Sequence, residues 1–328
     1  MVTPQTNTTL EEIARLLKDA DDVVICGHTS PDGDCIGSTL ALVHGLRSLG
    51  KRVQGLVVDP VPENLLGIPG AEELELAAQW QGSASCFVAV DVPDLKRMGS
   101  AAAAIHEAAP LTIRVDHHAV DERYSRYSYT DPDAVSTTVL VWELLEHLEA
   151  RKPEAAECCY AGLVTDSGRF EFQNTDERAF CAAAQMVAAG VDPARVSAYL
   201  YERDRLQSLQ VEMRAFERME LDTQLGYAMT YLTAEDFREF NADKSDAEGV
   251  VDLLRRLKDV RVLCCLREQD GKVRLSFRSK CAIDVREIAR GFGGGGHVAA
   301  SGATLEYPLA EAYARVKEAL VEACRRHG

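Results

Sequence analysis

Short apolar runs alternate with helical patterns over the first part of the chain. The runs that predict β-strands are Val23–Cys26, Val53–Val58, Cys86–Val90 and Leu111–Val115. After the first run, the segment Ile36–Leu49 places apolar residues at helical spacing, and Gly50 follows it, a residue type common just beyond helix ends. Strands that alternate with helices predict an α/β fold with a parallel sheet.

Helical patterns fill the middle of the chain, and strand patterns return after it. The predicted helices are Val135–Ala150, Glu154–Thr165, Thr175–Ala189, Pro193–Tyr201 and a connecting helix, Leu206–Leu221. The later strand-like runs are Tyr227–Leu232, Val260–Leu266 and Val273–Phe277. We therefore expect an N-terminal parallel-sheet domain over residues 1–205, a helical linker over 206–222, and a smaller α/β domain over 223–328.

The composition is that of an ordinary globular protein, but the charge is strongly negative. Of the 328 residues, 46% are hydrophobic and 27% are charged, and the formal net charge is −16. Long nucleic acid is held mainly by Lys and Arg, so this charge favours a small phosphorylated ligand. No apolar stretch is long enough to cross a membrane, and Thr9 opens an amphipathic helix instead of a signal peptide, so we expect a cytoplasmic protein.

A histidine and two acids stand where three of the predicted strands end. His28, Asp91 and Asp116 each come one or two residues after an apolar run. In a parallel α/β sheet, ligands collect at the carboxyl ends of the strands. We therefore expect these three side chains to meet at one edge of the sheet.

Further candidates complete four clusters of acids and histidines. They are His28 with Asp32 and Asp34, then Asp91, then Asp116 with His117 and His118, then Asp166. Carboxylates mixed with imidazoles suit ions such as Mg²⁺ or Mn²⁺, and several such sets favour two ions that share a carboxylate. Each cluster has an ordinary alternative: a turn or helix cap, the end of a strand or helix, or a solvated loop. Because all four alternatives would have to hold together, we predict a two-metal hydrolase.

A glycine run near the end of the sequence offers a second candidate site. Gly293–Gly296 can turn successive backbone N–H groups inward as an anion-binding nest, and a helix beginning at Val298 would add its dipole. Arg274 and Arg278 share one face of the preceding strand, which gives a local positive patch in an acidic chain. A flexible linker is the alternative, but we favour phosphate or nucleotide binding.

Together these motifs resemble the DHH phosphoesterase superfamily over nearly the whole chain. The N-terminal clusters match its metal-binding motifs, and Gly294–His297 matches the Gly-Gly-Gly-His signature of the DHH-associated C-terminal domain. Thr165–Phe170 and Ser276–Ser279 are similar to stretches of the nanoRNase subfamily, whose members are bifunctional oligoribonucleases and pAp phosphatases. No ligand that the resemblance requires is missing.

The resemblance implies a role for each candidate residue. One Mn²⁺ would be held by His28, Asp32 and Asp91, and the second by Asp34, Asp91, His117 and Asp166. His118 would contact the scissile phosphate, and Asp116 would orient the histidines. The nucleotide end of the substrate would be held in the C-terminal domain by Arg278, Ser279, Gly295, Gly296 and His297.

The resemblance also implies an activity. We expect a Mn²⁺-dependent phosphodiesterase and phosphatase, with Mg²⁺ or Co²⁺ as substitutes. It would degrade very short RNA, from linear dinucleotides such as pGpG to about pentanucleotides, and convert pAp to AMP by two-metal activation of water. The protein would be a homodimer that binds neither long nucleic acid nor membranes. The alternatives are a cyclic-dinucleotide phosphodiesterase of the same superfamily and a non-catalytic nucleotide-binding module. Loss of metal ligands would be the sign of such a module.

Overall fold

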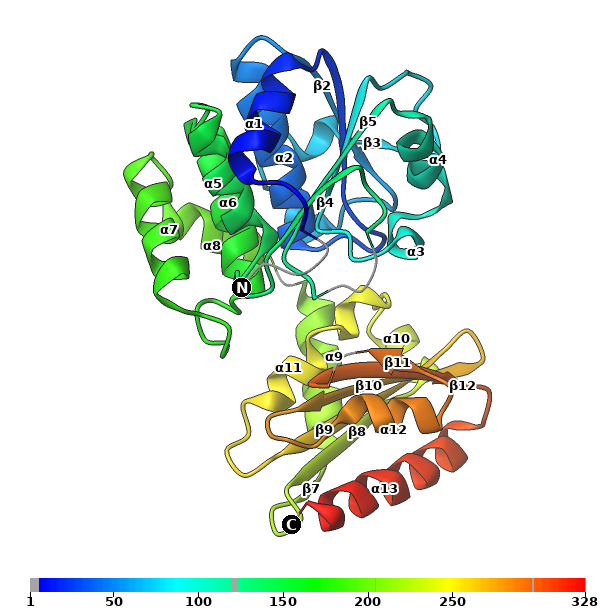
Figure 1. Ribbon diagram of the computed structural model, residues 1–328. Helices are drawn as coiled ribbons and strands as arrows, with labels where there is room; N and C mark the ends of the chain where they lie inside the picture. The colour runs from blue at the N-terminus through cyan, green and yellow to red at the C-terminus, as the bar shows by residue number, and fades with distance from the viewer. Residues whose placement is uncertain (1–5, 120–122, 204, 297, 328) are drawn as a thin grey trace. The chain divides into compact units, whose positions relative to one another are not determined.

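Two sheets of six strands organise the chain, one in each of two units, Met1–Arg203 and Asp204–Gly328 (Figure 1). The computed structural model describes residues 6–119, 123–203, 205–296 and 298–327. Within these ranges no helix is both long enough and apolar enough to span a bilayer. All the metal-ligand candidates belong to the first unit.

The sheet of the first unit is parallel throughout, which confirms the predicted fold class. Its strands are β1 (Asp22–Cys26), β2 (Arg52–Val57), β3 (Glu75–Leu76), β4 (Cys86–Val90), β5 (Leu111–Asp116) and β6 (Tyr127–Thr130). They lie in the order β3-β2-β1-β4-β5-β6. The two edge strands lack the apolar run that predicts the central four, because β3 has two residues and β6 alternates tyrosines with Ser128 and Thr130.

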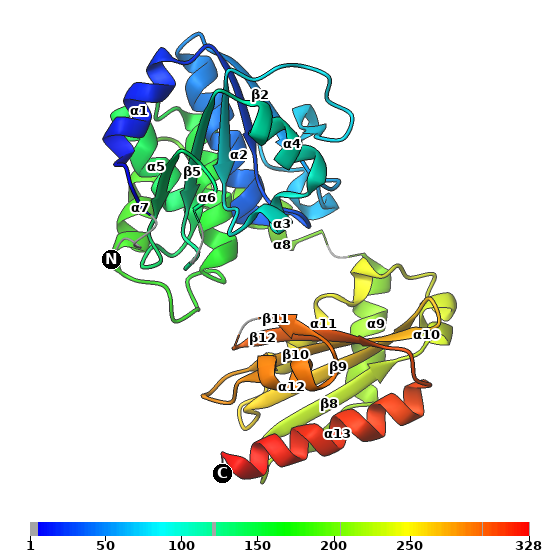
Figure 2. The same ribbon diagram turned by 45° about the vertical axis from the view of Figure 1, so that its right-hand side comes forward.

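Helices cover both faces of this sheet, which is why its central strands are apolar on both sides. On one face lie α1 (Leu10–Asp19), α2 (Gly33–Ser48), α5 (Thr137–His147) and α6 (Pro153–Asp166), and on the other lie α3 (Leu95–Met98) and α4 (Ser100–Ala108) (Figures 1 and 2). Val23 and Ile25 of β1 pack with the first group, whereas Val24 and Cys26 pack with the second. The unit also contains α7 (Glu177–Ala188), α8 (Pro193–Tyr201) and 3₁₀ turns at Glu63–Leu65 and Ala71–Glu73.

Helices α2 and α6 approach each other closely, and glycines allow this. A Cβ atom on Gly37 would lie 2.5 Å from the carbonyl oxygen of Cys158, and one on Gly162 would lie 3.0 Å from the Cα of Asp34. Because only glycine leaves this room, the first turn of α2 is held against the end of α6. Those two turns carry Asp34 and Asp166.

The sheet of the second unit is mixed. Its strands are β7 (Glu220–Asp222), β8 (Tyr227–Leu232), β9 (Val262–Gln269), β10 (Lys272–Ser279), β11 (Gly295–Gly296) and β12 (Ala300–Leu305). They lie in the order β11-β12-β10-β9-β8-β7, and every neighbouring pair is antiparallel except β8 with β9.

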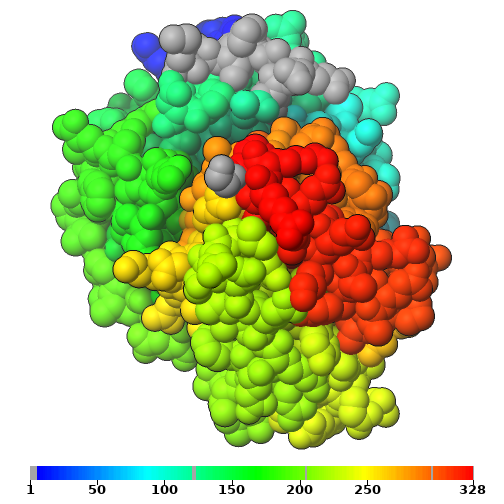
Figure 3. Space-filling model, turned by 90° about the horizontal axis from the view of Figure 1, so that it is seen from below, coloured from blue at the N-terminus to red at the C-terminus, as the bar shows by residue number. Residues whose placement is uncertain are grey.

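Helices also lie on both sides of this second sheet. On one side are α9 (Leu206–Glu217), α10 (Ala234–Glu239), α11 (Val250–Arg255) and a 3₁₀ turn at Ser245–Ala247, and on the other are α12 (Val285–Gly291) and α13 (Leu309–Arg326) (Figures 1 and 2). Helix α13 buries one side, including Val316 and Leu320, and leaves its outer side at the surface, red in Figure 3.

Two predictions for this part of the chain are wrong. The helix predicted over Leu206–Leu221 ends at Glu217, because Glu220–Asp222 pairs with β8. The helix predicted to begin at Val298 is replaced by a strand, because Ala300–Leu305 pairs with β10. The side chains of that strand alternate between more open and buried positions, a period of two that its small residues hide in the sequence. Among the described residues, no helix begins directly after the glycine run to add its dipole there.

We expect Gly37→Ala to destabilise the first unit by about 1–3 kcal/mol, because the added methyl group would collide with the carbonyl oxygen of Cys158. Gly291→Ala is a matched control, since a Cβ atom there meets nothing within 4 Å. Thermal denaturation followed by circular dichroism would compare the two variants with the wild type. Equal unfolding midpoints for all three would contradict the close packing of α2 on α6.

Candidate metal centre

The acids and histidines of the first unit meet at the carboxyl edge of its sheet. The strand order reverses between β1 and β4, and an open α/β sheet leaves a crevice at such a point. His28 follows β1, Asp91 follows β4, and Asp116 ends β5. The sequence prediction that these three side chains share one edge is therefore confirmed.

One group of donor atoms comes from His28, Asp32 and Asp91. Nε2 of His28 lies 3.6 Å from Oδ2 of Asp32 and 3.3 Å from Oδ2 of Asp91. Nδ1 of His28 lies 2.8 Å from the carbonyl oxygen of Thr29. A proton on Nδ1 would leave the lone pair of Nε2 toward the carboxylates, which is the tautomer that a metal ligand needs. One donor atom from each residue lies within 4.8 Å of the others.

Asp32 serves helix α2 as well as this group. Its Oδ1 accepts the backbone N–H of Cys35 at 3.0 Å and caps the helix, while its Oδ2 faces His28. The side chain is 56% exposed, which leaves room for a ligand. One oxygen of Asp32 thus caps α2, a role not expected from the sequence, and the other faces the donor group.

Asp34 lies in the first turn of α2 and is completely buried. Its two oxygens accept the backbone N–H groups of Thr137 at 2.6 Å and Thr138 at 2.7 Å, where α5 begins. Burial, together with the charge of Asp91, raises the pKa of Asp34 to about 7. The alternative in which Asp34 caps its own helix is wrong, because its oxygens bond to the start of a different helix.

A second group of donor atoms comes from Asp34, His117 and Asp166, again within 4.8 Å of one another. Nε2 of His117 lies 3.9 Å from Oδ2 of Asp34 and 3.4 Å from Oδ2 of Asp166. It also lies 3.6 Å from Oδ1 of Asp91. Asp91 therefore presents Oδ1 to this group and Oδ2 to His28, so that its carboxylate stands between the two groups.

The backbone of Asp91 adopts a conformation that few residues other than glycine accept. Its φ is +59°, in the left-handed region. The N–H of Asp91 donates to the carbonyl oxygen of Val115 at 3.1 Å, and the hydroxyl of Thr137 donates to Oδ1 at 3.0 Å. These bonds hold the strained residue with its carboxylate between the two donor groups.

A buried chain of charges holds His118. Oδ1 of Asp116 accepts Nδ1–H of His118 at 2.8 Å and the backbone N–H of the same residue at 3.0 Å. Oδ2 accepts the guanidinium of Arg114, which is fully buried. Although burial opposes ionisation, the bond from His118 and the charge of Arg114 lower the pKa of Asp116 to about 2. Asp116 thus orients His118, whereas Nδ1 of His117 lies 3.3 Å from the carbonyl oxygen of Ala134.

Acids crowd this edge of the sheet, and their charges oppose one another. Burial and the charges of Asp34 and Asp91 raise the pKa of Asp166 well above its usual range. Although burial opposes protonation of His28, its bonds to Asp32 and Asp91 raise the pKa of His28 to about 10. Bound protons therefore offset part of the negative charge of this site. Divalent cations can replace these protons. Carboxylate and imidazole donors are those that Mn²⁺ and related ions accept, so the residues fit two such ions.

Three of the substrate residues predicted in the second unit, Arg278, Gly295 and Gly296, lie at one end of its sheet. Arg278 on β10 pairs with Ala300 on β12, and Gly296 on β11 pairs with the next residue of β12, Ser301. The side chain of Arg278 is 30% exposed, and Gly295 and Gly296 are exposed. An anion at this end of the sheet would have access to all three residues.

Ser279 and His297 differ from the rest of this set. Ser279 is buried, and its hydroxyl donates to the carbonyl oxygen of Cys281 at 3.0 Å. Its hydroxyl proton therefore already has an acceptor within the chain. His297 lies outside the described residues.

Three residues beside the site carry little or no signal of their own in the sequence. Thr137 stands in a Ser-Thr-Thr run at the start of α5 and contacts both Asp91 and the backbone N–H of His117. In the sequence, the only indication of a special role for Arg114 is that a charged residue interrupts an apolar strand. Nη2 of Arg97, from α3, lies 3.1 Å from Nδ1 of His28. No pattern in the sequence places Arg97 there.

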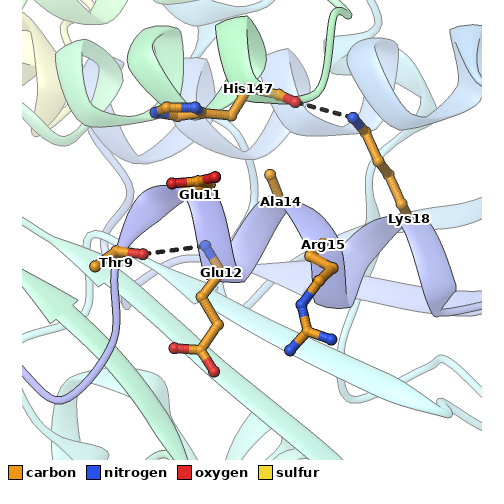
Figure 4. Close-up of a pocket in the computed structure, with 7 residues that line it drawn as sticks. All are labelled: Thr9, Glu11, Glu12, Ala14, Arg15, Lys18 and His147. Atoms are coloured by element: carbon orange, nitrogen blue, oxygen red, sulfur yellow. Dashed lines mark hydrogen bonds between the residues drawn. The ribbon is translucent and has the colours of Figure 1, made fainter.

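A surface hollow of the first unit lies against α1 and the end of α5 (Figure 4). There Nζ of Lys18 donates to the carbonyl oxygen of His147 at 3.0 Å, and Thr9 accepts the backbone N–H of Glu12 at 3.1 Å. None of the residues that line it belongs to either donor group. The hollow therefore does not extend the metal centre.

Comparisons with known proteins agree with this geometry. The model of the DHH family, N-terminal domain, matches residues 22–163, and that of the DHHA1 domain matches residues 224–326. The bifunctional oligoribonuclease and PAP phosphatase NrnA of Thermus thermophilus is 31% identical over 96% of this chain and 94% of its own length. The protein of the same name from Bacillus subtilis is 26% identical over 96% of this chain and 99% of its own.

A solved structure is similar over the whole fold. The crystal structure of an exopolyphosphatase-related protein from Bacteroides fragilis has a TM-score of 0.92 and 28% sequence identity, and the match covers 96% of each chain. The family resemblance expected from the motifs is confirmed. The chain belongs to the DHH family, with a DHH domain followed by a DHHA1 domain.

Proposed function

We propose that this protein is a metal-dependent phosphoesterase that degrades very short RNA to mononucleotides and converts pAp to AMP. The observation that carries this proposal is the pair of donor groups between which Asp91 divides its two oxygens. The names of the relatives support the choice of substrates. The reaction class is hydrolysis of phosphoester bonds.

The two donor groups would hold two ions with a shared carboxylate. His28, Asp32 and Asp91 would bind one, and Asp34, Asp91, His117 and Asp166 the other. We propose Mn²⁺ for both, with Mg²⁺ or Co²⁺ as substitutes, since all three accept oxygen and imidazole donors. Paired ions of this kind polarise a water molecule and offset charge on the phosphoryl group.

Residues of the protein would then orient the phosphoryl group. Because Nδ1 of His118 is bonded to Asp116, only Nε2 is left to donate to a phosphoryl oxygen. Arg114 keeps Asp116 ionised and turned toward His118. These contacts support electrostatic stabilisation of the transition state, with no covalent nucleophile from the chain.

The second unit would hold the nucleotide end of the substrate through Arg278, Ser279, Gly295, Gly296 and His297. In this scheme residues 1–205 are catalytic, residues 206–222 form a linker, and residues 223–328 bind substrate. A patch with few cations neutralises few phosphates. This supports short RNA as the substrate, as does the net charge of −16. We place the protein in the cytoplasm as a homodimer.

With Mn²⁺ present, linear dinucleotides and pAp should be turned over faster than a longer oligomer or a cyclic dinucleotide. Asp91→Asn should lower kcat by at least about 100-fold, because it removes a charge that both ions would share. Asp21→Asn is the matched control, since Asp21 is an exposed acid at the opposite end of β1. Chromatography of the released mononucleotides would measure each rate.

Two outcomes would overturn this proposal in different ways. Faster turnover of the cyclic dinucleotide than of the linear one would favour a cyclic-dinucleotide phosphodiesterase. Binding of the dinucleotide without product in the presence of Mn²⁺, Mg²⁺ or Co²⁺ would favour a non-catalytic nucleotide-binding module.

Metal binding should release protons and should weaken as the pH falls. The pKa of His28 in the metal-free protein is about 10, so its ring is protonated at neutral pH and the ion must displace that proton. Affinity for Mn²⁺ therefore rises with pH until His28 titrates near that value. Calorimetry in two buffers of different ionisation enthalpy counts the protons, and His28→Gln should release fewer than the wild type. Equal heats in both buffers for the wild type would show that no proton is displaced.

His118→Asn distinguishes a phosphate contact from a metal ligand. A donor atom of His118 also lies within 4.8 Å of donor atoms from Asp91 and His117, so ligation is the competing role. If His118 contacts the phosphate, the His118→Asn substitution should lower kcat by about 100-fold. The number of bound ions should stay the same. Loss of one ion from the variant, measured by calorimetric titration with Mn²⁺, would make His118 a ligand instead.

A further inference from the structure

Two arginines face each other across neighbouring strands of the second unit. Arg267 on β9 and Arg274 on β10 are register partners. Like charges directly opposite each other destabilise a sheet. Nη2 of Arg267 donates to the hydroxyl of Ser276 at 2.9 Å, but among the described residues no ion pair includes either arginine. This pair of cations therefore lacks an ion-pair partner within the described chain.

The face of the sheet that carries the two arginines is only partly covered. Helices α9, α10 and α11 lie on this side and bury residues of β8 and β9, such as Leu263 (Figure 2). Arg274 remains exposed on β10, and its partner on β12, Thr304, is exposed as well. Gly302, two residues before Thr304, lies on the same face of β12, so little side-chain bulk blocks approach to β10. A ligand can therefore lie along this strand.

Buried polar atoms on the same face lack partners. Gln269 lies two residues beyond Arg267 on β9, and so its side chain emerges on the same side. It is 7% exposed, and neither atom of its amide has a hydrogen-bond partner among the residues that the structure describes. Nε of Arg267 is also buried without a partner. Buried polar groups left in this state cost free energy, so the polar groups at this end of the face are not fully satisfied within the described chain.

The spacing along β10 separates this arginine pair from Arg278. Arg274 and Arg278 lie four residues apart on one face of the strand, which places their Cα atoms about 13 Å apart at the rise of a strand. This distance exceeds one nucleotide step of a single strand. A phosphate at Arg278 and a phosphate at Arg274 would therefore belong to different linkages of one RNA.

We propose that Arg267 and Arg274 form a second phosphate subsite, which binds a backbone phosphate of RNA beyond the nucleotide held at Arg278. The inference rests on the proposed function, because it takes RNA as the substrate. A phosphate between the two guanidinium groups would replace their repulsion with charge-assisted hydrogen bonds. A dinucleotide or pAp is too short to reach both Arg278 and this pair. The subsite would therefore add affinity only for the longer substrates.

The test compares KM for a pentanucleotide with KM for a dinucleotide, using the full-length protein and Mn²⁺. Arg274→Ala should raise the KM for the pentanucleotide, divided by the KM for the dinucleotide, roughly tenfold. This factor is the contribution of a charge-assisted hydrogen bond. Arg274→Lys should raise this ratio less, because the charge stays and the planar fork is lost. Arg315→Ala is the matched control, since Arg315 pairs with Glu311 on α13 and should leave the ratio unchanged. An unchanged ratio in Arg274→Ala would overturn the subsite.

Binding measurements separate this inference from the proposed function. In an Asp91→Asn background, the affinity for a labelled pentanucleotide would be measured over a range of salt concentrations. Arg274→Ala should lower the slope of log Kd against log salt by roughly 0.7, the effect of one phosphate contact on a single strand. If the wild type cleaves no RNA and the slope still falls, the subsite stands and the catalytic proposal fails. If the slope does not fall, the subsite is wrong whatever the activity.

Discussion

Repulsion among acids packed at one sheet edge is the constraint on which the first unit depends. Asp34 and Asp91 are both buried, and Asp166 lies close to them. The fold tolerates these charges because backbone N–H groups at the start of α5 bond to Asp34, and because protons on His28 and on the acids offset part of the remaining charge. Two divalent cations would offset the negative charge more strongly than protons do. The repulsion among the acids, which costs free energy in the metal-free fold, would therefore also favour metal binding.

The donor atoms are positioned mainly by the backbone. Asp91 is fixed by its left-handed conformation and a bond to β5, Asp32 by the N–H of Cys35, and Asp34 by glycine-mediated contact between two helices. Such supports are stiffer than long side chains, so the arrangement is set before any ion binds. His118 is the exception, because its position depends on the buried side chains of Asp116 and Arg114.

The sequence predicted the centre of the fold better than its edges. Apolar runs gave β1, β2, β4 and β5, and the rule for parallel sheets then placed the strand-end residues at one edge. Edge strand β6 and strand β12 escaped notice because their residues are polar or small, and only pairing with a neighbour makes them strands. The partners of Asp34 and the position of Arg97 depend on contacts between distant segments, which no local pattern encodes.

The double use of Asp32 has an evolutionary consequence. One oxygen starts helix α2 and the other faces His28. An asparagine at this position would keep the helix start through its amide oxygen and remove the negative charge. Since a single base change converts an aspartate codon to an asparagine codon, a folded descendant with an impaired metal centre is one mutational step away. At this residue, the charge that faces His28 can therefore be lost while the start of the helix is kept.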